Sequence, residues 1–300
     1  MLYNITHTTV YRYDEPVPLA HHLLRLRPRA HPRQRCETCD IMVDPRPAIR
    51  ADHDDHFGNH TTFVTVEGGH RELTVTARSR VELLPPEDYL TASLWGRPPA
   101  CRFPEPLAPW TPSTLSPLPA PIKSSEFCFD SPLIKTVPMY ADYAGSCFPA
   151  GRPLLEGVME LTGRIYRDFQ FDPEATTIST PIDEVFKNRR GVCQDFAHLE
   201  IACLRSLGIP ARYVSGYIET NPPPGKPRLA GADASHAWIS VYCEGSGWVD
   251  FDPTNNVIPS TRHITVAWGR DYSDVSPIRG VILGSGDHSL RVAVDVVPAT

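Results

Sequence analysis

The sequence predicts an α+β fold, with an antiparallel, β-sandwich-like N-terminal domain followed by a core in which a helix packs on a second antiparallel sheet. Two observations predict it. Apolar and polar residues alternate in several short runs before residue 90, with no helical pattern among them. Apolar residues at helical spacing begin near residue 153, and strand-like runs follow them. We expect three segments: a β-rich domain over 1–90, a connecting segment over 91–125, and a core with C-terminal strands over 126–300.

The N-terminal strands are predicted from alternation. It runs through residues 8–13, 61–66 and 73–83, as is typical of half-buried strands. Gly68-Gly69 separates the last two runs and predicts a hairpin turn. Several strands at short spacing favour a sandwich or a small barrel. Prolines then recur through the connecting segment and break any regular element there.

The core is predicted to begin with helices. The spacing of Leu154, Val158, Leu161 and Ile165 predicts an amphipathic helix over about 153–168. Pro181 suits the first turn of a second helix. A third helix begins at Cys193 and ends at Gly208, a favourable residue just beyond a helix C-terminus.

Strands complete the predicted core. They are expected over 212–219, 236–243 and 248–252, the last two joined as a hairpin through 244–247, and near the C-terminus over about 277–284 and 288–297.

Composition limits the function. The 300 residues carry 29 Lys and Arg against 35 Asp and Glu, a net charge of −6, which argues against nucleic acid or an anionic membrane surface as the main partner. No apolar run approaches the ~18 residues of a membrane helix. Residues 1–7 do not resemble a signal peptide, so we expect a cytoplasmic location and reduced cysteines. Nothing in the sequence bears on oligomeric state.

Cys193 is the candidate nucleophile. It lies where a glycine-containing loop, with Gly191, passes into the third helix. The positive end of a helix dipole and free backbone N–H groups favour a thiolate there. Gly191 would also allow a substrate backbone to approach closely. A cysteine at a helix start is nevertheless often only structural, so the interpretation depends on a nearby base.

His236 and Asp252 are the candidate base and orienting carboxylate. His236 lies on a predicted strand whose other face is apolar. Pairing of residue 241 with 247, or of 242 with 248, would put Asp252 on the same face as His236, where it can fix one imidazole tautomer. Asp250 is a rival on that face. Trp238 and Tyr217 are candidates to line a substrate cleft, although core packing is an equal alternative for both.

Four blocks of the sequence carry a family resemblance. They are Gly191-Val192-Cys193-Gln194-Asp195-Phe196-Ala197-His198-Leu199, Gly208-Ile209-Pro210-Ala211-Arg212, Ser235-His236-Ala237-Trp238 and Trp248-Val249-Asp250-Phe251-Asp252-Pro253-Thr254. In order and spacing they resemble the transglutaminase-like core of the papain-like cysteine enzymes. Tyr11-Arg12-Tyr13 and 55–59 resemble the β-rich domain that precedes this core in bacterial members, and 271–277 also looks typical of them.

The resemblance implies a Cys193, His236 and Asp252 triad that acts on an amide bond through a thioester. It does not fix the reaction, because similar folds include peptidases, deamidases, protein cross-linkers and members without a triad. We expect a cysteine hydrolase on a peptide or protein substrate, with a protein-glutamine acyltransferase or a non-catalytic binding module as the alternatives.

No metal or cofactor is expected. The sequence has no acidic loop like the calcium sites of animal transglutaminases. His53, His56 and His60 lie among acidic residues over 52–55, a pattern that suits either a divalent metal or a polar loop, and we favour the loop. Cys36 and Cys39 form a single CxxC pair, without the second pair that a zinc ribbon needs.

Overall fold

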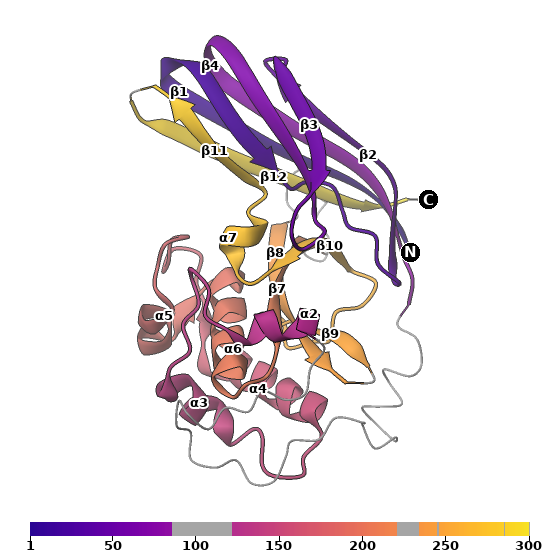
Figure 1. Ribbon diagram of the computed structural model, residues 1–300, viewed down its shortest axis with the longest axis vertical. Helices are drawn as coiled ribbons and strands as arrows, with labels where there is room; N and C mark the ends of the chain where they lie inside the picture. Colours follow the sequence, from indigo (N-terminus) through magenta and orange to yellow (C-terminus); the bar gives the residue numbers. More distant parts are fainter. Residues whose placement is uncertain (86–121, 221–233, 245, 285, 300) are drawn as a thin grey trace, which may run out of the picture.

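The computed structural model describes residues 1–85, 122–220, 234–244, 246–284 and 286–299. Figure 1 shows a sheet of long strands above a lower body of helices and a second sheet. Most of the expected connecting segment, residues 86–121, lies outside the described residues. Strands predominate and are antiparallel in both large sheets, so the predicted α+β class is confirmed.

Two very long strands form the N-terminal sheet. β1 (Leu2–Leu24) and β4 (His60–Leu83) pair antiparallel along nearly their whole length. β2 (Gln34–Asp44) pairs with the second half of β4, and β3 (Ile49–Asp54) pairs with its first half. Each long strand therefore contributes to two layers of the sheet.

The predicted hairpin at Gly68-Gly69 is wrong, because β4 runs through both glycines without turning back. Gly68 has φ +87°, and the β1–β4 register shifts between Val17 and Leu19, opposite the glycine pair. Glycine tolerates the positive φ that such an irregularity requires. The glycine pair therefore marks an irregularity inside one strand rather than a connection between two strands.

An apolar core lies between the two layers. Buried residues from both halves of β4, such as Val64 and Val75, cluster with Val17, Leu24 and Ile41. This packing of one sheet half on the other makes the domain sandwich-like, as predicted.

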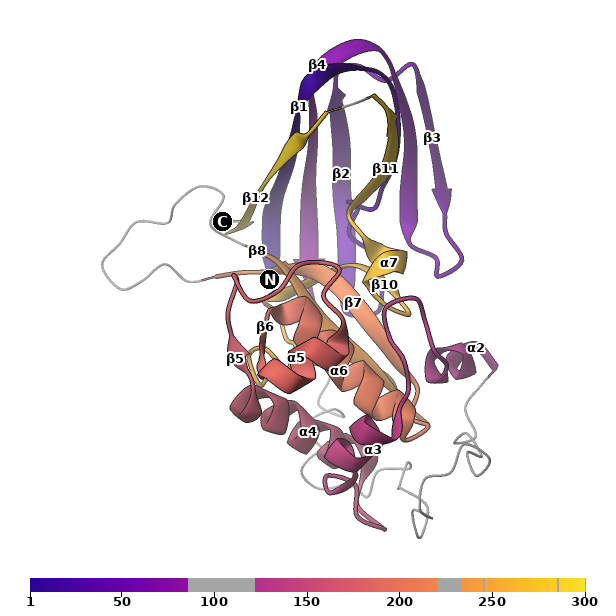
Figure 2. The ribbon, with the colours of Figure 1, turned by 90° about the vertical axis from the view of Figure 1, so that its left-hand side faces the viewer.

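The C-terminal strands belong to the N-terminal sheet. β11 (Ile278–Leu283) pairs with the second half of β1, and β12 (His288–Pro298) pairs with the first half. Figure 2 shows both, in yellow, beside the indigo strands. The chain thus returns from the core to complete the sheet with which it began.

The second sheet has the order β10-β7-β8-β9 and is antiparallel. Its strands are β7 (Ala211–Ile218), β8 (Ala234–Cys243), β9 (Gly247–Phe251) and β10 (His263–Gly269). The first three match the predicted strands within two residues. β10 was not predicted.

Helices cover this sheet. The predicted helices appear as α4 (Leu154–Asp168), α5 (Ile182–Asn188) and α6 (Cys193–Ser206). The remaining short elements are α2 (Ile122–Ser125), η1 (Glu126–Cys128), α3 (Pro138–Gly145), α7 (Tyr272–Val275) and a two-stranded ladder of β5 (Gln170–Phe171) with β6 (Arg190–Gly191). In the described part of the chain, no helix combines the length and the apolar character needed to cross a membrane.

One hydrophobic cluster joins the two parts of the molecule. It contains Ile5 from β1 and Val294 from β12, together with Phe196 and Leu199 of α6 and Ile239 of β8. The inner face of the N-terminal sheet therefore packs directly on the core, close to the start of α6 (Figure 1).

Candidate active site

Cys193 is the first residue of α6. Val192 before it has extended backbone, with φ −115° and ψ −178°, so the helix begins at the cysteine as predicted. The Asp195 carboxylate accepts the Val192 N–H at 2.8 Å and the Thr176 hydroxyl at 2.6 Å. Asp195 thereby fixes the helix start from within the first turn, where an acidic side chain is favourable.

Gly191 has a structural role that differs from the predicted one. A Cβ on Gly191 would lie 2.7 Å from Asp195 Oδ2 and 2.9 Å from Asp195 Cβ. The missing side chain therefore makes room for the carboxylate that holds the helix start. The close approach of a substrate backbone at Gly191 stays a prediction.

The β8–β9 hairpin places His236 and Asp252 together. Tyr242 pairs with Trp248, which is one of the two predicted registers. Asp252 follows β9 directly, and its Oδ2 accepts a hydrogen bond from His236 Nε2 at 2.8 Å. His236 is also hydrogen-bonded to Cys193. The structure thus brings all three predicted residues into one chain of contacts.

The charges at the site favour a protonated His236. Burial alone would lower the pKa of His236, but the hydrogen bonds and negative charges of Asp252 and Cys193 outweigh it and raise the pKa to about 10. The imidazole is therefore protonated at neutral pH, beside both a carboxylate and the sulfur atom. Nε2 faces Asp252, so the opposite ring nitrogen, Nδ1, is left for the cysteine.

Asp252 is fully buried and receives many donors. Its Oδ1 accepts the backbone N–H groups of Thr254 at 2.9 Å and Asn255 at 3.2 Å. Its Oδ2 also accepts the Asn255 amide at 2.7 Å. Burial by itself would raise the pKa of Asp252, but its hydrogen bonds, with that from His236 first, hold the pKa well below its usual range. Asp252 is thus a fixed anion.

His263 is a site residue that the sequence reasoning missed. Its Nε2 donates to Asp252 Oδ2 at 3.0 Å, and its ring lies edge-on to Trp238 at 5.3 Å between centroids. His263 comes from β10, the strand that was not predicted. A histidine at a strand start was the available signal, but only the pairing of β10 with β7 brings it to the site.

His236, Asp252 and His263 also form a group that could hold a metal ion, with ligand atoms within 4.8 Å of one another. Both Nε2 atoms, however, lie 2.8 and 3.0 Å from the same carboxylate oxygen. Those are hydrogen-bond lengths, and an ionised carboxylate can only accept. The two N–H groups therefore account for the arrangement without a metal ion.

Trp238 and Tyr217 are not brought into the active-site cavity formed by the described residues. Trp238 is fully buried against His236, and its indole N–H donates to Asp250 at 3.2 Å. The Tyr217 hydroxyl bonds His7 Nδ1 of β1 at 3.0 Å. Both aromatics pack in the interior, which was the alternative interpretation, and Asp250 is engaged with Trp238.

A cavity of about 500 Å³ opens beside Cys193 and His236. Cys193 and His236 line it together with Gln194 of α6 and Tyr213 of β7. The other described lining residues from the core are Ile178, Val192, Ser215, Ser235, Ala237 and Tyr272. Those from the N-terminal sheet, together with Pro277 just before β11, are His7, Thr9, Tyr11, Ile278, Leu290, Val292 and Val294. Cys193 therefore lies in a cleft between the two parts of the molecule.

The histidine-rich stretch near residue 55 has structural contacts. Asp55 Oδ1 accepts the backbone N–H groups of Phe57 and Asn59, both at 2.9 Å, which makes a tight turn. His56 lies 2.9 Å from Glu126, and His60 lies 3.5 Å from Asp52. His56 and His60 thus have separate partners.

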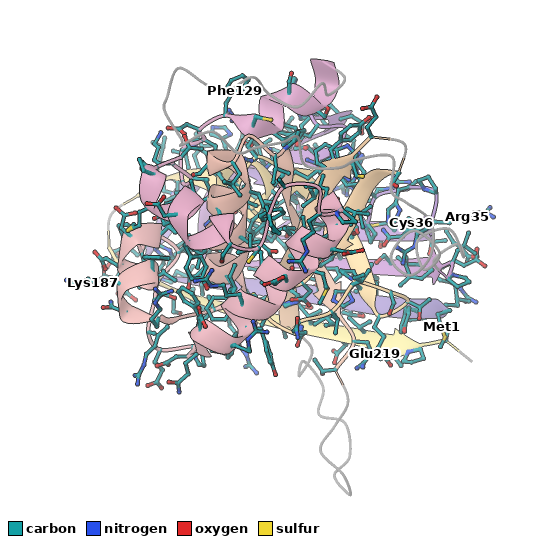
Figure 3. The ribbon with its side chains drawn as sticks, turned by 90° about the horizontal axis from the view of Figure 1, so that it is seen from below. Met1, Arg35, Cys36, Phe129, Lys187 and Glu219 are labelled. Carbon is teal, nitrogen blue, oxygen red and sulfur yellow. The ribbon has the colours of Figure 1, made fainter. Side chains whose placement is uncertain are left out.

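The CxxC cysteines lie on β2, and Figure 3 shows Cys36 at the edge of the molecule beside Arg35. All the cysteines in the described part of the chain carry free thiols.

Comparison with known proteins agrees with this architecture. Residues 3–82 match the bacterial transglutaminase-like N-terminal region, and residues 143–253 match the transglutaminase-like superfamily. An uncharacterized protein of Mycobacterium tuberculosis is 42% identical over 301 residues, covering 99% of this chain and 92% of the relative. A protein-glutamine gamma-glutamyltransferase of Pseudomonas aeruginosa is 34% identical over 108 residues, covering 33% of this chain and 16% of that protein.

The whole fold also has a solved counterpart. The crystal structure of a candidate cysteine protease from Cytophaga hutchinsonii superposes with a TM-score of 0.73 at 20% identity, covering 100% of this chain and 92% of that one. At this identity the likeness concerns the fold alone. The two matched regions and the full-length relative show the family: the chain belongs to the transglutaminase-like superfamily.

Proposed function

We propose that the protein is a cysteine enzyme that cleaves an amide bond through a Cys193 thioester, with a peptide or protein as substrate. The observation that carries the proposal is the contact chain from Cys193 through His236 to Asp252. An imidazolium beside the sulfur atom of a helix-start cysteine stabilises the thiolate, which is the nucleophilic form.

The chemistry follows from these contacts. The Cys193 thiolate attacks the carbonyl carbon and forms a C–S bond. The C–N bond then breaks while the His236 imidazolium gives its proton to the leaving amine. Water next attacks the thioester carbonyl and forms a C–O bond, while the now neutral His236 takes the proton of the water. The C–S bond then breaks, which releases the acid product and restores the imidazolium and the thiolate. Asp252 keeps Nε2–H in place throughout both halves of the cycle.

Attack on the carbonyl carbon puts a negative charge on the carbonyl oxygen, and this oxyanion needs hydrogen-bond donors. The backbone N–H of Cys193 is one, since it lies at the free end of α6. Tyr213 is our candidate for the second, because it lines the same cavity and burial raises its pKa, which keeps its hydroxyl protonated. The Gln194 amide, by contrast, already donates to the Ile178 carbonyl at 3.3 Å. Tyr213→Phe should then lower kcat by about 10²-fold or more with little change in KM.

Acyl transfer to an amine is the second candidate, favoured by the local similarity to the glutamyltransferase of Pseudomonas aeruginosa. We prefer hydrolysis because water needs no second binding site. Peptide amides and glutamine peptides, assayed with and without a primary amine, separate the two. Release of free acid or ammonia without amine supports hydrolysis, whereas product that forms only with amine identifies a transferase. Absence of any turnover, together with a Cys193 no more reactive than a free cysteine, would favour a non-catalytic binding module.

A further inference from the structure

We infer that the cleft beside Cys193 selects substrates whose side chains next to the reacting amide are uncharged and apolar. This rests on the proposed function, since it names the substrate class of the same site. The inference comes from the chemistry of the walls that the N-terminal sheet and β12 add to the cavity.

The described walls carry no permanent charge. Among the described lining residues there is no Lys, Arg, Asp or Glu, although 21% of the whole chain is charged. His7, which lines the cleft from β1, has its pKa lowered to about 4 by burial and is neutral at pH 7. The pKa of Tyr11 is raised to about 12, chiefly by burial, so it is neutral as well. Apart from the catalytic pair, the described cleft is thus electrically neutral at pH 7.

One wall is a continuous apolar stripe on β12. Leu290, Val292 and Val294 alternate along the strand and so share one face. Val294 is buried in the core cluster, which shows that this face points inward. Leu290 and Val292 remain 53% and 47% exposed. Apolar surface thus runs from the core outward along the cleft, beside the nucleophile.

These walls distinguish apolar from charged substrate side chains, because the two differ in what they lose when they leave water. An apolar side chain laid on the stripe removes both surfaces from water, which is favourable at ~25 cal/mol per Å². A charged side chain would lose water there and find no partner of opposite charge among the described walls. The geometry therefore favours apolar neighbours of the amide and disfavours charged ones.

Alkylation of Cys193 tests the cleft without requiring turnover. Three reagents share the uncharged iodoacetamide group that reacts with the thiol, and they differ only in the group that would lie on the wall. They are iodoacetamide, N-benzyl iodoacetamide and N-(4-carboxybenzyl) iodoacetamide. Each rate is measured by mass spectrometry of the Cys193 peptide and divided by the rate of free cysteine. Other half-buried thiols interfere little, since burial raises the pKa of Cys39 to about 12 and of Cys128 to about 11.

We expect the normalised rates to fall in the order benzyl, unsubstituted, carboxybenzyl. Leu290→Lys should cut the ratio of benzyl to carboxybenzyl rates about tenfold, because it puts a cation on the stripe. Leu283→Lys is the matched control. Leu283 is 57% exposed on β11, which also pairs with β1, but it does not line the cavity, so the ratio should not change. Val292→Lys is a second substitution on the same stripe. Circular dichroism of each variant shows whether that variant is folded.

The two proposals fail differently. Equal normalised rates for all three reagents in the wild type, or an equal effect of the Leu290 and Leu283 substitutions, would overturn the apolar cleft even if Cys193 reacts fast. The expected order with rates no faster than those of free cysteine would support the cleft and count against the thiolate nucleophile.

Discussion

Removing the charge of Asp252 should make His236 lose its proton at a much lower pH. The shift of the His236 pKa from 6.5 to about 10 corresponds to about 5 kcal/mol of preference for the imidazolium, and the Asp252 hydrogen bond is the largest favourable contribution. In Asp252→Asn that hydrogen bond no longer has an anionic acceptor. We expect the midpoint of the His236 titration to move at least about half of the way back to 6.5. That shift is a loss of about 2–3 kcal/mol of the preference for the imidazolium.

Imidazole NMR measures this directly. Protein labelled with 15N in its histidine rings is titrated from pH 5 to pH 11, and the His236 signals are assigned with His236→Gln. Asp250→Asn is the matched control, since Asp250 lies two residues earlier and accepts from Trp238 rather than from His236. A wild-type midpoint near 6.5, or equal shifts in the two Asn variants, would mean that Asp252 does not hold the proton on His236.

Three further predictions follow from single contacts. Gly191→Ala should cost about 1–3 kcal/mol of unfolding free energy and slow Cys193 alkylation, because the added Cβ displaces the Asp195 carboxylate. Gly145→Ala is the control and should do neither, since there is open space where its Cβ would lie. Fully buried Glu200 has its pKa raised from 4.5 to about 8, so the native state holds an extra proton between these values and loses stability as pH rises through them. Denaturant titrations should therefore show the stability of Glu200→Gln gaining on the wild type from pH 5 to pH 8, by a few kcal/mol at most; a constant difference would contradict this. His263→Gln should lower kcat/KM about tenfold and displace the His236 titration midpoint, whereas loss of thermal stability alone would mean a merely structural role.

Local sequence patterns predicted α6 and the β8–β9 hairpin well. The start of α6 at Cys193 and its end before Gly208 depend on neighbouring residues, and the Tyr242–Trp248 pairing depends on a short turn. These features are set within a few residues along the chain, so spacing and turn chemistry are sufficient to predict them.

Features that depend on pairing between distant strands could not be predicted from the sequence. The pairing of β12 with β1 joins residues almost 300 positions apart, and no local pattern indicates it. The same limit hid His263 and the cleft wall on β12, because both reach the site only through sheet pairing. Gly68-Gly69 was misleading, since a glycine pair can mark an irregularity within a strand as well as a turn. The proposed domain limits and cytoplasmic location stay predictions, and cell fractionation would test the latter.

Trapping of the acyl-enzyme identifies the residue that attacks the amide. The protein is mixed with a library of peptide amides and glutamine peptides with apolar flanking residues, quenched in acid, and analysed by mass spectrometry. We expect a single hydroxylamine-sensitive acyl group on Cys193, absent from Cys193→Ala. Acylation at another residue, or amide turnover that survives Cys193→Ala, would contradict it.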